Sequence, residues 1–242
     1  MYRDPDRLVE VVARYCHQGI VTGEAPVVIA TSEHRAAFAR RLTALGTDVP
    51  ACTRRDQYLE LDAHECLAAF MVDGRPDRER FFGAIAPHLA GVRRAGYERI
   101  RLYGEMVELL RDDAFAAAMR LEELWHELLE AERVPLLCAY HVDPLDRHDG
   151  RTVVPAIARR HSHVLPAEDA RRFEWSVERA FLDVFGADAD TTLLRELCER
   201  YRAPASAMPP AQAVLFNLDD LMPDLGDAVR SMAARHYREA VA

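Results

Sequence analysis

Apolar residues along the first 142 positions follow two different spacings. Helical spacing predicts helices over residues 4–19, 32–46, 63–71, 78–95 and 113–131. Continuous apolar runs between these helices predict strands over residues 25–30, 58–61, 100–103 and 134–140. The run at 134–140 is apolar enough to predict a central strand, buried on both faces. Helices that alternate with strands indicate an α/β layer fold with a mainly parallel sheet.

The pattern changes after residue 142. Residues 143–150 are polar and contain Pro and Gly, and a short helix is predicted over 152–160. Pro166 introduces a region predicted to be wholly helical, with helices over 167–185, 191–201, 210–221 and 226–241. We therefore expect three parts: an α/β domain over 1–142, a connector over 143–165 and an α-helical appendage over 166–242.

Composition narrows the possible functions more than any single motif does. All 31 basic residues of the 242 are arginine, and the chain has no lysine. A Walker A loop needs a lysine at the phosphates, and pyridoxal enzymes and Schiff-base aldolases need a lysine amine. The sequence therefore excludes all three classes. It also has no GxSxG and no GxGxxG motif, so no motif supports a function as a hydrolase or as a dehydrogenase.

Charge and polarity indicate where the protein acts and what it contacts. The net charge of −9 argues against direct binding of nucleic acid, because such affinity depends on clustered positive charge. No apolar run approaches the roughly 20 residues that cross a bilayer, and the first residues are charged. We expect a cytoplasmic protein that does not bind membranes. The five cysteines are odd in number and scattered, which favours free thiols.

The ends of the predicted strands are the first candidate site. In open parallel sheets, ligands bind at the edge formed by the carboxyl ends of the strands. Gly104, Glu105 and Met106 follow the strand at 100–103, Thr31 follows the strand at 25–30, and His141 follows the strand at 134–140. These residues predict a ligand-binding cleft.

The helix predicted at 113–131 adds three candidate ligand contacts. Glu122, Trp125 and His126 share one face of this helix, so a carboxylate and an imidazole lie beside an indole. Two purely structural alternatives, which involve no ligand, stay open. The carboxylates of Glu105 and Glu122 could form internal ion pairs with Arg101 or Arg120, and Trp125 could belong to the core.

Metal binding and catalysis have weaker support. The run from His126 to Glu130 starts like the HExxH zinc motif but has Glu130 where the second histidine ligand belongs. A second candidate is a group of histidines in one stretch of the chain: His141, His148, His161 and His163. A metal site needs three or four convergent ligands, which spacing cannot show. We therefore expect no metal, no cofactor and no catalytic residue.

Five short stretches, taken together, resemble the MEDS domain. They are GEAPVVIAT at 23–31, FMVDGRPD at 70–77, GEMV at 104–107, LEELW at 121–125 and LLCAY at 136–140. The family takes its name from methanogens and from the regulator of dichloromethane dehalogenase. The chain departs from the family pattern in two places. Family members begin with a short strand that contains His and ends in Phe-Tyr, of which only Tyr2 is present, and they commonly have Asn where this chain has His126.

The resemblance implies a fold and a role. It implies a doubly wound sheet related to the RecA and KaiC fold, without a working nucleotide loop. It also implies a sensory function, with small hydrocarbon derivatives as proposed ligands, and no reaction. We thus expect a non-catalytic protein that binds a small molecule in signal transduction or transcriptional control.

Two alternatives remain at this stage. A degenerate RecA-like domain could serve only in assembly, and the histidine group could bind a metal. For the C-terminal helices we expect self-association or docking of a protein partner. A helix-turn-helix role is disfavoured because the segment at 217–221 is acidic, whereas a recognition helix is basic.

Overall fold

The computed structural model describes residues 1–111, 115–164, 169–186, 196–197 and 209–240. The chain forms two compact units. The α/β unit comprises Pro5–Tyr140, and the helical unit comprises Met1–Asp4 together with His141–Ala242. A compact unit qualifies as a domain when it folds alone, so the predicted boundaries at residues 142 and 166 stay predictions.

The α/β unit is built on a parallel sheet of four strands in the order β2-β1-β5-β6. Their bounds are β1 Ala25–Ala30, β2 Leu59–Asp62, β5 Ile100–Gly104 and β6 Leu136–Cys138. The chain moves from β1 outward to β2 and then returns past β1 to β5. This reversal makes the sheet doubly wound, as predicted, and places the topological switch point between the ends of β1 and β5.

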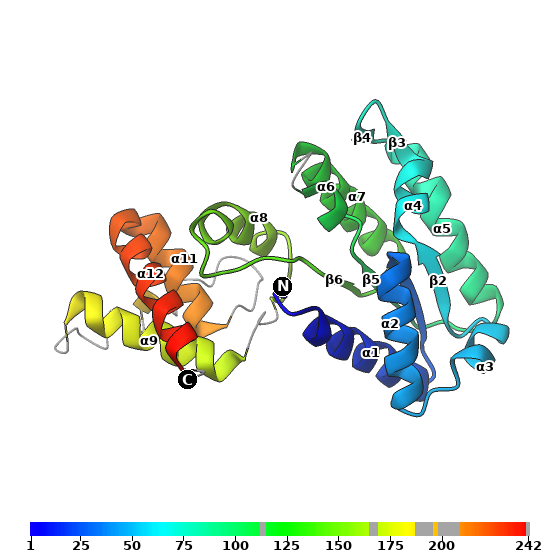
Figure 1. Cartoon of the computed structure of the whole chain (residues 1–242). Coiled ribbons are helices and arrows are strands. Elements are labelled where there is room, and N and C mark those ends of the chain that lie inside the picture. The colour runs from blue at the N-terminus through cyan, green and yellow to red at the C-terminus, as the bar shows by residue number, and fades with distance from the viewer. Residues whose placement is uncertain (112–114, 165–168, 187–195, 198–208, 241–242) are drawn as a thin grey trace. The chain divides into compact units, whose positions relative to one another are not determined.

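Helices cover the two faces of this sheet (Figure 1). α1 (Pro5–Val21) contacts α2 (Ser32–Ala44), whereas α5 (Arg78–Arg94) contacts both α4 (Ala63–Phe70) and α7 (Phe115–Glu132). Because crossovers between parallel strands are right-handed, reversal of the winding direction puts these two groups on opposite faces. Three elements were not predicted as helices or strands: α3 (Val49–Arg54), α6 (Glu108–Arg111) and the hairpin of β3 (Met71–Val72) and β4 (Arg75–Pro76).

The position of β6 corrects one prediction. β1 is a central strand and all six of its residues are buried. β6 pairs only with β5 among the described strands, and its three residues are half-buried, so it is an edge strand. The apolar run misled because its most buried residues, Ala139 and Tyr140, lie beyond the strand. A continuous apolar run does not distinguish a central strand from an edge strand that helices cover.

The helical unit has its own core. It contains a π-helical turn η1 (Asp149–Val153), α8 (Val154–Ala158), α9 (Ala170–Phe185), α11 (Pro210–Leu221) and α12 (Pro223–Glu239). Apolar side chains of α9, α11 and α12 form one buried cluster. The helix predicted at 191–201 lies outside the described residues except for positions 196 and 197. Within the described ranges, no helix is long and apolar enough to cross a membrane.

Candidate functional site

A buried carboxylate lies at the topological switch point of the sheet. β5 ends at Gly104, and the next side chain, Glu105, is only 4% exposed. Gly104 and Met106 on either side are also buried. Carboxylates are rarely buried unless they are paired, so the interactions of Glu105 define the site.

Glu105 accepts hydrogen bonds from three donors on two different segments. Its Oε1 atom accepts the backbone N–H of Thr31 at 2.7 Å. Its Oε2 atom lies 2.7 Å from Nδ1 of His34 and accepts the hydroxyl of Tyr103 at 2.8 Å. A carboxylate is only an acceptor, so Nδ1 of His34 carries the proton. The carboxylate thereby joins the end of β5 to the start of α2.

The first turn of α2 has the geometry of an anion-binding site. Thr31 is the N-cap of α2, and its hydroxyl accepts the N–H of His34. The N-terminus of a helix carries partial positive charge and unpaired N–H groups, which favour an anion. In this chain the position is occupied by the chain's own Glu105 carboxylate. An external anion would have to displace it.

Burial and pairing act in opposite directions on the protonation of Glu105. Burial raises the pKa of this carboxyl, but the hydrogen bonds from His34 and Thr31 outweigh burial and lower the pKa below its ordinary value. The hydrogen bond to Glu105 raises the pKa of His34, against the smaller lowering effect of burial. Each partner thus favours the charged form of the other.

His34 was missed by the sequence analysis, although a signal existed. It lies three residues after Thr31 and therefore in the first turn of a helix that starts at the predicted edge. Its ring stacks on Phe38 one turn later, with centroids 5.7 Å apart. Phe38 is fully buried and packs edge-to-face against Tyr103. Phe38 thus contacts both side chains that donate hydrogen bonds to Glu105.

The predicted contacts on α7 divide between the interior and the surface. Glu122 is 2% exposed and accepts the hydroxyl of Tyr140, and Trp125 is 2% exposed and meets Phe81 edge-on. A β-carbon added to Gly104 would lie 3.9 Å from the Trp125 ring, so this indole packs on the end of β5. His126 is exposed.

The last predicted contact belongs to the other unit. His141 is exposed and lies in the helical unit, where it forms an isolated parallel bridge with Tyr2. Tyr2 is the residue at which this chain matches the first strand of the family pattern, and it is paired here as in a parallel strand.

Arg101 and Arg120, the alternative ion-pair partners of the two carboxylates, pair with other residues. Arg101 pairs with Glu24, and its guanidinium lies 4.7 Å from the ring centroid of Tyr15. Arg120 pairs with Glu123, its neighbour on α7. Helical and strand spacing does not reveal which cation reaches a carboxylate from another segment, and for Glu105 the cation comes from α2.

The metal candidates have no supporting geometry among the described residues. Among the described residues, no group of three or more His, Cys, Asp or Glu side chains is placed to hold a metal ion. His163 contacts the hydroxyl of Ser162 at the surface, and His161 contacts the carbonyl of Ile157. Burial raises the pKa of the Cys138 thiol, which makes this cysteine a poor nucleophile.

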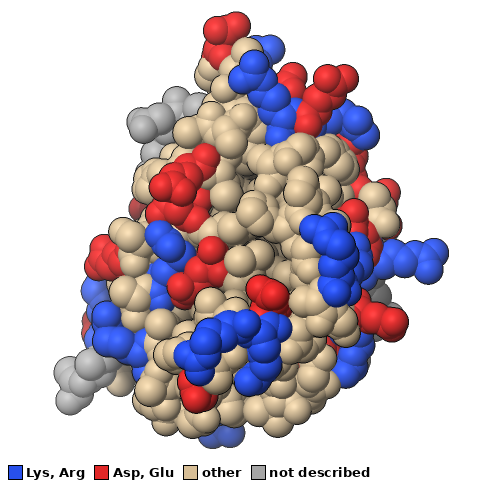
Figure 2. All heavy atoms as spheres, turned by 90° about the vertical axis from the view of Figure 1, so that its right-hand side faces the viewer, with Lys and Arg blue, Asp and Glu red and all other residues tan. Residues whose placement is uncertain are grey.

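A separate hollow lies at the opposite edge of the sheet. It has a volume of about 270 Å³ and is lined by the start of β2 and the second half of α5, with Asp56, Leu59, His88, Gly91 and Arg94 among its residues. Figure 2 shows the side of the molecule that carries these elements, with basic and acidic side chains interspersed over it. This hollow is open to solvent and has both polar and apolar residues in its lining, in contrast to the buried cluster around Glu105.

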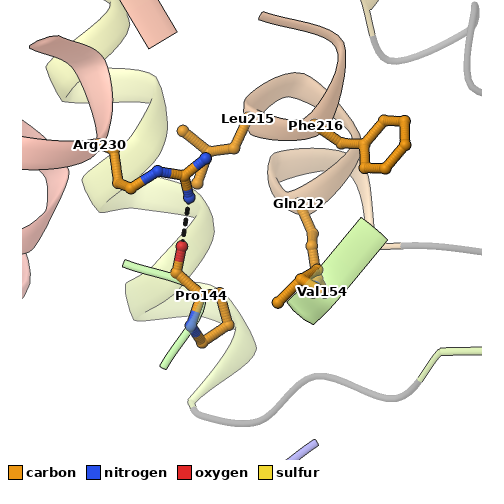
Figure 3. A pocket seen from close by; sticks show the side chains of 6 residues that line it. All are labelled: Pro144, Val154, Gln212, Leu215, Phe216 and Arg230. Carbon is orange, nitrogen blue, oxygen red and sulfur yellow. Dashed lines mark hydrogen bonds between the residues drawn. The ribbon is translucent and has the colours of Figure 1, made fainter. Parts of the chain in front are cut away.

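The helical unit contains a much smaller cavity, of about 10 Å³. Figure 3 shows the buried Arg230 at its wall, donating to the carbonyl oxygen of Pro144, and Arg230 also pairs with Asp219. The volume suits about one water molecule, and the polar lining includes the buried Gln212. These contacts hold the segment after residue 142 onto α12.

Comparison with known proteins gives one family. The model of the MEDS family, described as "MEthanogen/methylotroph, DcmR Sensory domain", matches residues 1–161. Neither a curated protein nor a solved structure matches the chain.

Proposed function

The chain belongs to the MEDS family of sensory domains, and from this premise we propose that it binds a small molecule over the ends of β1 and β5. Binding there would shift the α/β unit between two conformations and so control a regulatory output. The observation that carries this proposal is the buried Glu105, which gathers donors from two segments at the edge where open α/β sheets bind ligands.

The surroundings of Glu105 suggest the chemistry of the ligand. Phe38, Tyr103 and Met106 are buried and apolar or aromatic, and the hydrogen-bonding groups among them are few. Small-molecule sites commonly combine such a lining with a few convergent polar groups. We propose a small, largely apolar ligand with one hydrogen-bonding group, which agrees with the hydrocarbon derivatives that the family resemblance implies.

The described conformation is closed at this edge. Glu105 and Met106 are 4% and 1% exposed, so a ligand that contacts them enters only after the edge opens. A site that is formed in a minor conformation and stabilised by its ligand is consistent with a sensor, because the ligand then shifts the conformational equilibrium.

Catalysis is not part of the proposal. The chain lacks the lysine that several cofactor and phosphate chemistries need, and burial raises the pKa of Cys138. The anion position at the start of α2 is filled by Glu105, which argues against a bound nucleotide.

We expect protein purified from its own host to carry its ligand. Native mass spectrometry should give a mass above that of the denatured chain by one fixed increment, and the increment identifies the chemical class of the ligand. The control is the same protein after denaturation, removal of small molecules and refolding. A native mass equal to the sequence mass would contradict ligand retention, and a clean oligomer of that mass would favour the assembly alternative.

For the helical unit we propose docking of a protein partner or a second copy. Trp175 on α9 is 50% exposed, and Leu221 and Leu225 near the junction of α11 and α12 are 45% and 38% exposed. Large exposed apolar side chains are enriched at interaction surfaces. We expect light scattering after size exclusion to give a dimer, or a pull-down from host lysate to recover a partner that the Trp175→Arg variant loses. A monomer at high concentration with an empty pull-down would overturn this proposal.

A further inference from the structure

Glu105 and His34 are two titratable side chains whose contact joins the end of β5 to the first turn of α2. One partner, Glu105, follows β5 and is 4% exposed, whereas the other, His34, belongs to α2 and has a side chain that is 22% exposed. Nδ1 of His34 faces the carboxylate, so its proton exchange with solvent takes place at Nε2. A buried charge is therefore balanced by a charge that water can reach.

We propose that Glu105 and His34 form a latch that holds the first turn of α2 on the end of β5, and that this hold weakens when His34 loses its positive charge. The same carboxylate also binds the N–H of Thr31, so weakening of the pair acts directly on the N-cap of α2. The latch regulates access to the edge where the ligand is proposed to bind, and in that respect it rests on the proposed function.

Few other charges act on the pair. Glu33, the neighbour of His34 on α2, adds to the rise in the pKa of His34, and Tyr103 on β5 donates to Glu105 in either state. Arg35, the next cation on α2, is held 2.7 Å from Asp62 at the end of β2. Among the described residues, Glu105 pairs with His34 and with no arginine, so the charge of His34 is the one that titrates against it.

The direction of the pH effect follows from the two shifts. The pKa of His34 is raised above 6.5 in the fold, so its contribution to closure is complete below 6.5 and is lost as pH rises through the raised value. The pKa of Glu105 is lowered below 4.5, so this carboxylate stays charged throughout that range. The latch is thus closed in mildly acidic solution and loosens toward alkaline pH.

Hydrogen exchange of the Thr31 amide tests the latch without any ligand. After correction for intrinsic rates, protection of this amide should fall about fivefold or more between about pH 6 and about pH 8.5, equivalent to ~1 kcal/mol. The amide of Ile29 in the central strand β1 serves as an internal reference and should keep its protection.

Two variants separate the latch from a general effect of pH. His34→Asn places a neutral amide nitrogen near the position of Nδ1 and should abolish the pH dependence at Thr31. His88→Asn, an exposed histidine on α5, should retain the wild-type dependence. Equal protection of Thr31 at both pH values in the wild type, or a pH dependence that survives in His34→Asn, would overturn the latch. Either result would leave ligand retention in native mass spectrometry unaffected, so the two proposals fail separately.

Discussion

Phe38→Ala will lower the free energy of unfolding of the α/β unit by about 3–5 kcal/mol. The Phe38 ring is fully buried, stacks under His34 and meets Tyr103 edge-on, so its removal leaves a cavity beneath the polar cluster. Urea unfolding followed by Trp125 fluorescence measures this loss in a Trp175→Phe background. Trp175 is the other tryptophan of the chain and is half-exposed in the helical unit, so the background change removes its signal at small cost.

Two further variants serve as comparisons for Phe38→Ala. Phe38→Leu keeps most of the buried volume and should lose less than half as much stability. Phe82→Ala removes a half-buried ring on α5 and should also cost less, because solvent already reaches that side chain. If Phe38→Ala were no less stable than Phe82→Ala, the aromatic support beneath the Glu105 cluster would be disproved.

Glu105→Ala will lower the stability of the same unit by about 2–4 kcal/mol. The truncation removes the acceptor of the Thr31 N–H and the Tyr103 hydroxyl and leaves His34 without its counter-charge. Buried donors without acceptors are costly, whereas exposed ion pairs contribute little. Thermal unfolding monitored by circular dichroism, with urea unfolding as a second measure, gives the loss.

The matched control is an exposed carboxylate. Glu123→Ala breaks the surface pair with Arg120 and should change the free energy of unfolding by less than about 1 kcal/mol. Glu105→Gln keeps the shape of the side chain and should lie between the two. Glu105→Ala and His34→Asn should be less than additive when combined, because they remove the same interaction. Strict additivity would show that the two residues act independently.

Much of the α/β unit could be predicted from local pattern. The run at 25–30 is continuous and apolar because β1 is paired on both sides and covered on both faces, and Thr31 is a good N-cap residue for the helix that follows. The doubly wound order came from the family resemblance, since local spacing does not contain the order of strands. Short elements such as α3 and α6 were missed because four to six residues are too few to establish a period.

Three residues of the candidate site were predicted to lie together, but their interactions were not predicted, and ligand binding there stays a prediction. The rule that ligands bind at the carboxyl ends of strands selected Thr31, Gly104 and Glu105, and the structure brings these three together. The sequence analysis considered an ion pair with Arg101 or Arg120 as an alternative for Glu105 and did not consider His34. His34 fills that role because the first turn of α2 lies directly over β5, a contact between segments about 70 positions apart that no local pattern encodes.

The proposed ligand site at the ends of β1 and β5 is tested most directly in two valine variants. Native mass spectrometry measures the fraction of each variant that carries the retained molecule. Gly104→Val adds bulk at the end of β5, beside Leu136 and Trp125, and Gly91→Val adds the same bulk at the hollow on the opposite edge. We predict that Gly104→Val loses the added mass and that Gly91→Val keeps it, with both proteins folded by circular dichroism. Retention in Gly104→Val with loss in Gly91→Val would place the ligand in the hollow and contradict a site at the switch point.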